Sequence, residues 1–312
     1  MTGDRPRNRG RSPFRRLSVA KRGTAPFSIA LLAVLLLSPV VAIEAQTAAF
    51  SAKVEAVRVD ALVTERDNGP AILGLGPSDF EVYDNGVLQQ VDLVSFDEVP
   101  LNVILTLDMS DSVAGERLDH LRGAGAALLA ALKKDDQAAL VTFSHLVTLG
   151  AGLTKDVVPV RRAIDEVAGS GETSLVDGTY AAITLGESDA GRALVIVFSD
   201  GVDSSSWLPA DAVLDAAKRS DAVVYAVSTR SRLKPEFLRD VTSLTGGRLF
   251  EVERTAALGA IFVSVLEEFR RRYLISFTPR GVEKSGWHRL EVRLKGRRGN
   301  VKARPGYLAG SP

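Results

Sequence analysis

Cysteine is absent from this 312-residue chain, and histidine is scarce, with three residues far apart in the sequence. Without a thiol there are no disulfides, thiolate metal sites, cysteine nucleophiles or cysteine-linked lipid anchors. His120, His145 and His288 have no zinc-ligand spacing, so we expect each to be an ordinary surface or half-buried residue. The motifs HExxH and GxxxxGK[ST] are missing too, as is a Ser-His-Asp order with supporting motifs. No familiar catalytic signature is present.

The N-terminal region differs in composition from the rest of the chain. Residues 1–26 carry eight Lys or Arg residues against one acid, and an apolar run from Phe27 to Ile43 follows. This order is typical of a secretory signal, and Ile43-Glu44-Ala45 predicts cleavage before Gln46. An uncleaved membrane anchor is the alternative, although Ser38 and Pro39 interrupt a run that is short for a bilayer. We expect export to the periplasm, cell envelope or medium.

The charge of the chain depends on this segment. The whole sequence has 39 basic and 38 acidic residues, and residues 1–45 contain eight of the basic and two of the acidic ones. The remainder therefore has 31 basic against 36 acidic residues, a net charge of −5. A mildly acidic protein is a poor candidate for general nucleic-acid binding.

Short alternating strands are predicted on both sides of a central region. Residues 50–98 contain two such stretches with Asn-Gly turns, which are strong hairpin signals. Residues 273–309 return to a β pattern. Neither flank has enough strands for a stable core of its own, so we expect both to pair into one small β-sandwich-like domain.

Between these flanks, apolar strands alternate with helical patterns, which predicts an α/β fold with a doubly wound, mainly parallel sheet. Strands are expected at 102–108, 137–144, 146–153, 192–200, 221–229 and 248–252, and helices at 117–134, 156–168, 174–187, 209–220, 235–246 and 256–272. Arg270, Arg271 and Arg272 are interpreted as the favourable positive end of the last helix. The predicted division is 1–45 signal, 46–99 N-terminal β segment, 100–272 α/β domain and 273–312 C-terminal β segment.

A cluster of oxygen side chains ends the first strand of the α/β region. The stretch VILTLDMSDSVAG places Asp108, Ser110 and Ser112 directly after a fully apolar strand. In open α/β sheets ligands bind beyond the carboxyl ends of the strands, and hard oxygen donors suit Mg²⁺, Mn²⁺ or Ca²⁺. Alone, this Asp-x-Ser-x-Ser pattern is a weak signal for a metal and is more typical of a helix N-cap with a polar loop.

Two later loops strengthen the metal interpretation. GSGETSLVDGT places Thr173 in a glycine-rich loop before a helix, and LVIVFSDGVDSSS ends a second buried strand at Asp200. A doubly wound sheet brings such loops to the same edge. Asp111 either raises cation affinity or faces solvent, and Asp203 either supports the site or caps a helix. Asp177 is expected to be structural.

This ordered set of three loops resembles a von Willebrand factor type A domain with a metal-ion-dependent adhesion site, over about residues 102–272. The resemblance implies a Rossmann-like fold and metal binding through Ser110 and Ser112. Asp108 and Thr173 would bind directly or through water, and Asp200 mainly through water. Met109 and Asp111 stand where many relatives have Thr and Gly. The flanks DFEVYDNGVLQQVDLVSF and VKARPGYLA resemble a secreted bacterial subfamily first described in Acidobacteria.

The resemblance implies a binding module rather than an enzyme. A cation with an open position would accept an Asp or Glu carboxylate from a partner protein. A Mg²⁺-dependent phosphatase-like hydrolase is one alternative, but it needs a second acid where Ser110 stands. A structural envelope protein with a vestigial site is the other. Contact with a membrane is expected only through the N-terminal segment, if it is uncleaved.

Overall fold

The computed structural model describes residues 56–67, 69–96, 98–199, 202–229 and 234–310. The expected signal at residues 1–45 lies outside this part of the chain. In the described residues, no helix has both the length and the apolar character needed to cross a bilayer.

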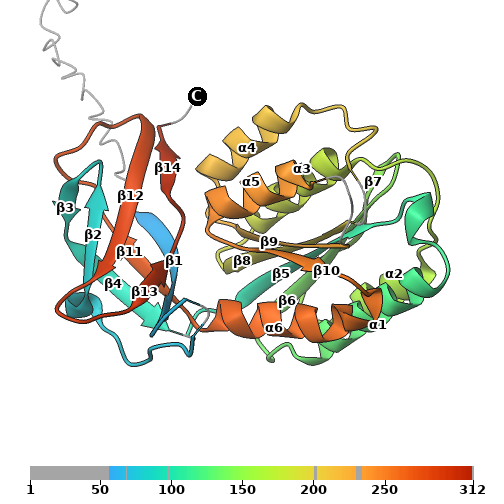
Figure 1. Cartoon of the computed structure of the whole chain (residues 1–312), viewed down its shortest axis with the longest axis horizontal. Helices are drawn as coiled ribbons and strands as arrows, with labels where there is room; N and C mark the ends of the chain where they lie inside the picture. Colours follow the sequence, from blue (N-terminus) through green and yellow to red (C-terminus); the bar gives the residue numbers. More distant parts are fainter. Residues whose placement is uncertain (1–55, 68, 97, 200–201, 230–233, 311–312) are drawn as a thin grey trace, which may run out of the picture. The chain divides into compact units, whose positions relative to one another are not determined.

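A six-stranded sheet forms the centre of the α/β domain (Figure 1). Its strand order is β10-β9-β8-β5-β6-β7, and all neighbours are parallel except β7, which is antiparallel to β6. The strands are β5 (Leu101–Asp108), β6 (Gln137–Phe143), β7 (Val147–Thr154), β8 (Arg192–Ser199), β9 (Val223–Thr229) and β10 (Leu249–Val252). The predicted α/β, mainly parallel fold class is confirmed.

Helices cover both faces of this sheet. They are α1 (Glu116–Ala130), α2 (Val157–Glu166), α3 (Leu175–Gly186), α4 (Ala210–Arg219), α5 (Glu236–Thr245) and α6 (Leu258–Arg270). Helices α1, α2 and α6 pack on one face, and α3, α4 and α5 on the other. Successive residues of a strand alternate between the two faces, so β5 sends Val103, Leu105 and Leu107 to one core and Ile104 to the other.

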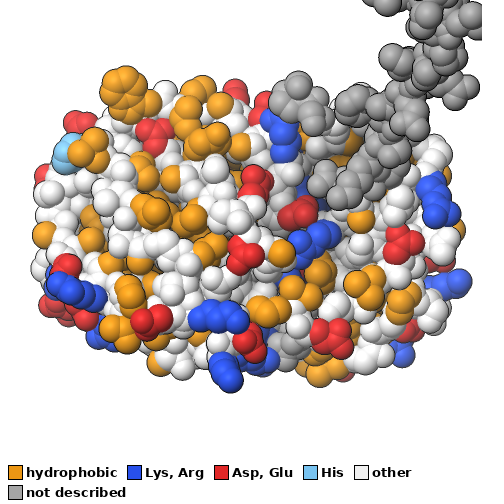
Figure 2. Space-filling view, turned by 180° about the vertical axis from the view of Figure 1, so that it is seen from behind, with side chains coloured by type: hydrophobic (Ala, Val, Ile, Leu, Met, Phe, Trp, Pro, Cys, Tyr) orange, Lys and Arg blue, Asp and Glu red, His pale blue; other side chains and the backbone are white. Residues whose placement is uncertain are grey.

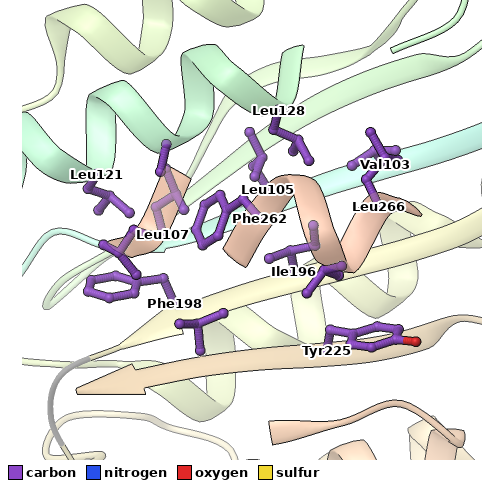
Figure 3. Packing of buried hydrophobic residues seen from close by; sticks show 14 of the residues in the cluster. Val103, Leu105, Leu107, Leu121, Leu128, Ile196, Phe198, Tyr225, Phe262 and Leu266 are labelled. Carbon is purple, nitrogen blue, oxygen red and sulfur yellow. The ribbon is translucent and has the colours of Figure 1, made fainter. Parts of the chain in front are cut away.

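The first of these cores is tightly filled by aliphatic and aromatic side chains (Figure 3). Phe262 and Leu266 of α6 and Leu121 and Leu128 of α1 meet the side chains of β5, and Ile196, Phe198 and Tyr225 extend the contact along β8 and β9. A strand buried on both faces in this way has no freedom to slip in register, because a one-residue shift would exchange its two cores. The end of β5 is therefore held in a fixed place.

The two flanks of the chain form two further antiparallel sheets. One has the order β13-β1-β11-β4, and the other β14-β12-β2-β3. Their strands are β1 (Val57–Thr64), β2 (Phe80–Asp84), β3 (Val87–Gln89), β4 (Val91–Phe96), β11 (Arg272–Phe277), β12 (Gly286–Leu294), β13 (Asn300–Lys302) and β14 (Gly306–Ala309). Each sheet mixes strands from both flanks, and both supply one apolar core. We call this part the β-framework.

Two details of the β-framework differ from the sequence analysis. After β1 the described residues form no second hairpin strand: an isolated bridge joins Thr64 and Ala71, Ile72 N–H donates to the Val63 carbonyl, and β1 pairs with β11 and β13. His288 is not an ordinary surface or half-buried histidine, since only 1% of it is exposed. Its Nδ1 lies 2.8 Å from the Asp84 carboxylate, and the Tyr307 hydroxyl donates to that same carboxylate.

The arginines at the end of α6 have a further role that was not predicted. Arg270 is buried and donates to the Asp136 carboxylate at 2.6 Å. Arg272 is fully buried and donates to the Tyr225 hydroxyl and to the Gly246 carbonyl at 2.8 and 2.7 Å. Arg270 does lie in the last turn of α6, as expected for a positive helix end, but Arg270 and Arg272 also form specific buried hydrogen bonds that were not predicted.

The surface carries charges of both signs. Figure 2 shows one face, on which Lys and Arg side chains alternate with Asp and Glu and hydrophobic side chains lie between them. On this face no large area carries charge of one sign. It therefore lacks the basic stripe to which the phosphate backbone of a nucleic acid binds.

Candidate metal centre

Asp108 is the last residue of β5, and its carboxylate is fully buried. One carboxylate oxygen accepts the backbone N–H of Ser110 at 2.9 Å. The other accepts the hydroxyl of Ser199, the last residue of the neighbouring strand β8, at 2.6 Å. The two hydrogen bonds fix the orientation of the carboxylate. The fold thus holds an oriented carboxylate at the carboxyl edge of the sheet.

The two serine hydroxyls of the motif lie side by side. Ser110 Oγ and Ser112 Oγ are 3.0 Å apart, with Ser110 buried and Ser112 exposed. Ser110 precedes a short 3-10 turn at Asp111–Val113, and Ser112 lies within it. This tight turn brings the two hydroxyls together. Adjacent ligands of an octahedral ion bound at 2.0–2.1 Å are about 2.9 Å apart. The two hydroxyls are hydrogen-bonded to each other, and the same spacing suits two neighbouring positions on one small cation.

Thr173 reaches this edge of the sheet through its loop. Two hydrogen bonds tie the glycine-rich loop to the serine loop: Ser170 N–H donates to the Met109 carbonyl, and Asp111 N–H to the Gly171 carbonyl. Thr173 itself is buried, and its backbone exchanges hydrogen bonds with Ser204. The loops that carry Asp108, Ser110, Ser112 and Thr173 thus meet at one edge. Asp200 lies outside the described residues, directly after Ser199.

Three further acids have defined structural roles. The Asp111 carboxylate is exposed and accepts the N–H of Gly171 at 2.9 Å, which braces the two loops. The Asp203 carboxylate accepts the N–H of Val176 in the first turn of α3, so its helix-capping role holds in the described residues. Asp177 accepts the N–H groups of Trp207 and Leu208, in keeping with the expected structural role.

Sequence reasoning missed the residues that hold the loops in place. Ser199 orients Asp108, and Ser204, Ser205 and Ser206 bond to residues 173–177. The signal was present, because SDGVDSSS places a run of hydroxyls directly after the second buried strand. Serine runs are common in ordinary loops, so the run alone does not mark a site. Only the pairing of β5 with β8 shows that Ser199 lies beside Asp108.

The donor set fits a hard divalent cation. All candidate ligands are carboxylate or hydroxyl oxygens, which Mg²⁺, Mn²⁺ and Ca²⁺ prefer, and no imidazole is among them. Within the described part of the chain, no three acidic or histidine side chains gather in a way that could hold a metal. Among the candidate ligands that the structure describes, Asp108 would supply the negative charge that balances the cation, and the hydroxyls would be neutral ligands.

Comparison with known proteins identifies the family of the α/β domain. A family model for the von Willebrand factor type A domain matches residues 102–263, about half of the chain. The chain belongs to this family. Such domains commonly mediate protein–protein interactions and often carry a divalent cation at a metal-ion-dependent adhesion site. A search among curated proteins finds no match.

Solved structures share the type A fold at low sequence identity. A von Willebrand factor type A protein from Catenulispora acidiphila is 13% identical with a TM-score of 0.53, and the match covers 75% of this chain and 73% of that one. Proximal thread matrix protein 1 from mussel byssus is 18% identical with a TM-score of 0.49, over 58% of this chain. The match spans about half of the mussel protein, one structure of which has a zinc-occupied adhesion-site motif.

Proposed function

We propose that this protein is an exported, metal-dependent protein-binding module for adhesion or scaffolding. Asp108, Ser110, Ser112, Thr173 and Asp200 would hold one divalent cation, Mg²⁺ or else Mn²⁺ or Ca²⁺. The observation that carries the proposal is the buried Asp108 carboxylate next to two hydroxyls 3.0 Å apart, at the carboxyl edge of a type A sheet.

The coordination of the cation leaves room for an external carboxylate. Hydroxyl ligands carry no charge, so the protein offers the cation no more than the two carboxylates of Asp108 and Asp200. Mg²⁺ takes six oxygens and normally keeps several waters. An Asp or Glu side chain of a partner protein can replace one of these waters as a ligand, which makes the cation the centre of the interface.

Binding is proposed over catalysis because of the residue two places after Asp108. A phosphatase of the kind considered above needs a general acid there, whereas Ser110 has a hydroxyl that does not ionise near neutral pH. Export is proposed from the basic and apolar N-terminal segment, with the β-framework typical of the secreted bacterial subfamily named above.

Affinity capture from cell-envelope extract tests the proposal. The protein with Mg²⁺ should retain partner proteins that EDTA releases, and Asp108→Asn should retain none of them. Asp135→Asn is the matched control, because Asp135 is an exposed carboxylate in a surface ion pair with Lys155. Capture that persists in EDTA, or that Asp108→Asn leaves intact, would show that the cation is not the centre of the interface.

A further inference from the structure

Trp207 is the most exposed large hydrophobic residue among the described residues, with 92% of its surface accessible. The other tryptophan of the chain, Trp287, is 41% exposed and lies in β12 of the β-framework. Tryptophan is rarely left in water, because its indole has a large apolar surface that is favourable to bury. An indole held almost wholly in solvent therefore needs an explanation.

A loose loop does not explain this exposure. The Trp207 and Leu208 N–H groups donate to the two carboxylate oxygens of Asp177, each at 2.9 Å. Leu208 turns inward and packs against the core formed by α3, α4 and α5. The backbone on both sides of the indole is thus fixed, and the side chain projects from a rigid base.

The base of Trp207 is also the base of the candidate metal centre. Residues 203–208 bond to residues 173–177 along their whole length, from the Thr173 carbonyl, which accepts Ser204 N–H at 2.9 Å, to the Asp177 carboxylate. Thr173 precedes α3 and Asp177 lies in its first turn, four residues further along the chain. Hydrogen bonds therefore hold two segments together: the one that carries the candidate ligand Thr173, and the one that carries the exposed Trp207.

We propose that Trp207 is the apolar anchor of the partner interface that the cation centres. This inference rests on the proposed metal-dependent binding function. The partner it fits is a protein segment with an Asp or Glu that reaches the cation and an apolar or aromatic side chain a few residues away that packs on the indole. Rigid aromatic side chains are favoured interface anchors, because little conformational entropy is lost when they bind.

A peptide selection tests this two-point recognition. Random 12-residue peptides displayed on phage are panned against the Mg²⁺-loaded protein and eluted with EDTA. The wild type should enrich peptides with one acid and one apolar residue at a fixed spacing. Trp207→Ala should keep the acid but lose the apolar preference, and it should bind the wild-type peptides about tenfold more weakly or worse. Val158→Ala is the control, because Val158 is 68% exposed but lies in the first turn of α2, away from the loops at the carboxyl edge.

Fluorescence gives a second readout of the same contact. In Trp287→Phe, Trp207 is the only tryptophan, and a selected peptide should shift its emission to shorter wavelength as the indole leaves water. Acidic peptides that leave the emission unchanged, or that bind Trp207→Ala as well as the wild type, would overturn the role of Trp207 alone. If neither protein enriches acidic, EDTA-eluted peptides, the proposed function itself fails.

Discussion

The Asp60 carboxylate, in the first strand of the β-framework, pairs with the Arg192 guanidinium at the start of β8 in the α/β domain. Arg192 Nε donates to Asp60 Oδ1 at 2.9 Å, and both side chains are buried. The same guanidinium donates to the Arg272 carbonyl, where α6 ends and β11 begins. The Arg192 side chain thus joins the sheet of the α/β domain to strands from both flanks.

Replacing Asp60 with Ala should therefore destabilise the protein strongly. Removal of one partner of a buried ion pair leaves the other charge uncompensated, which costs about 3–5 kcal/mol of unfolding free energy. Urea denaturation followed by circular dichroism measures the change. The exposed Asp135–Lys155 pair is the control, because Asp135→Ala should change the unfolding free energy by about 1 kcal/mol at most. Equal effects of the two substitutions would contradict the role given to Arg192.

Asp136 should make stability depend on acid pH. Burial raises its pKa, but hydrogen bonds from Arg270 and from the N–H groups of Leu101 and Lys133 outweigh burial and hold the pKa below its ordinary value. A carboxyl with a lowered pKa stabilises the fold above its unfolded pKa of about 3.9, and that stabilisation is lost as the pH falls through the folded pKa.

The matching experiment compares the wild type with Asp136→Asn by urea denaturation between pH 7 and pH 3. The difference in unfolding free energy should be about 3 kcal/mol at neutral pH. It should shrink only below about pH 4, where the carboxyl of the unfolded wild-type chain takes up a proton before that of the folded chain. A difference that is constant across this range would show that Asp136 acts through packing and not through its charge.

Asp177→Ala should loosen the loop that carries Trp207 without unfolding the domain. The substitution removes the acceptor of two N–H groups, those of Trp207 and Leu208. Hydrogen exchange should become faster at these two amides, while the amides of β5 and β8 keep their protection. Unchanged exchange at Trp207 and Leu208 would contradict the rigid base on which the proposed anchor depends.

A chain of residues 46–272 should aggregate or lose stability relative to residues 46–312. It lacks all of β12, β13 and β14 and nearly all of β11, which pair with β1, β2 and β4 in the intact protein. Unpaired strand edges with apolar faces are prone to associate. Thermal unfolding and light scattering measure the two effects. Equal melting temperatures with no added scattering would mean that the flanks are independent of one another.

Much of the α/β domain could be predicted from the sequence. The six strands and six helices lie within a few residues of the predicted ranges, because strands buried on both faces read as unbroken apolar runs. The polar network could not be predicted in the same way. Arg270 and Arg272 stand two residues apart in an apparent basic cluster, and only the fold shows that each has a buried acceptor far along the chain.

The candidate site was predictable only where it depends on residues that are close together in the sequence. Asp108, Ser110 and Ser112 form a local pattern, and the 3-10 turn that joins the hydroxyls is local as well. Ser199 and Asp177 act across the gap between separate loops, so their roles depend on which strands are neighbours. Trp207 gave no signal in the sequence, because burial and exposure of a single tryptophan follow from packing alone.

The central claim is that Asp108 belongs to a divalent-cation site, and calorimetric titration with Mg²⁺ and Mn²⁺ tests it most directly. The wild type should bind one cation, and Asp108→Asn, which keeps the size of the side chain but not its charge, should bind it about a hundredfold more weakly or not at all. Equal cation affinity in the wild type and in Asp108→Asn would contradict the account.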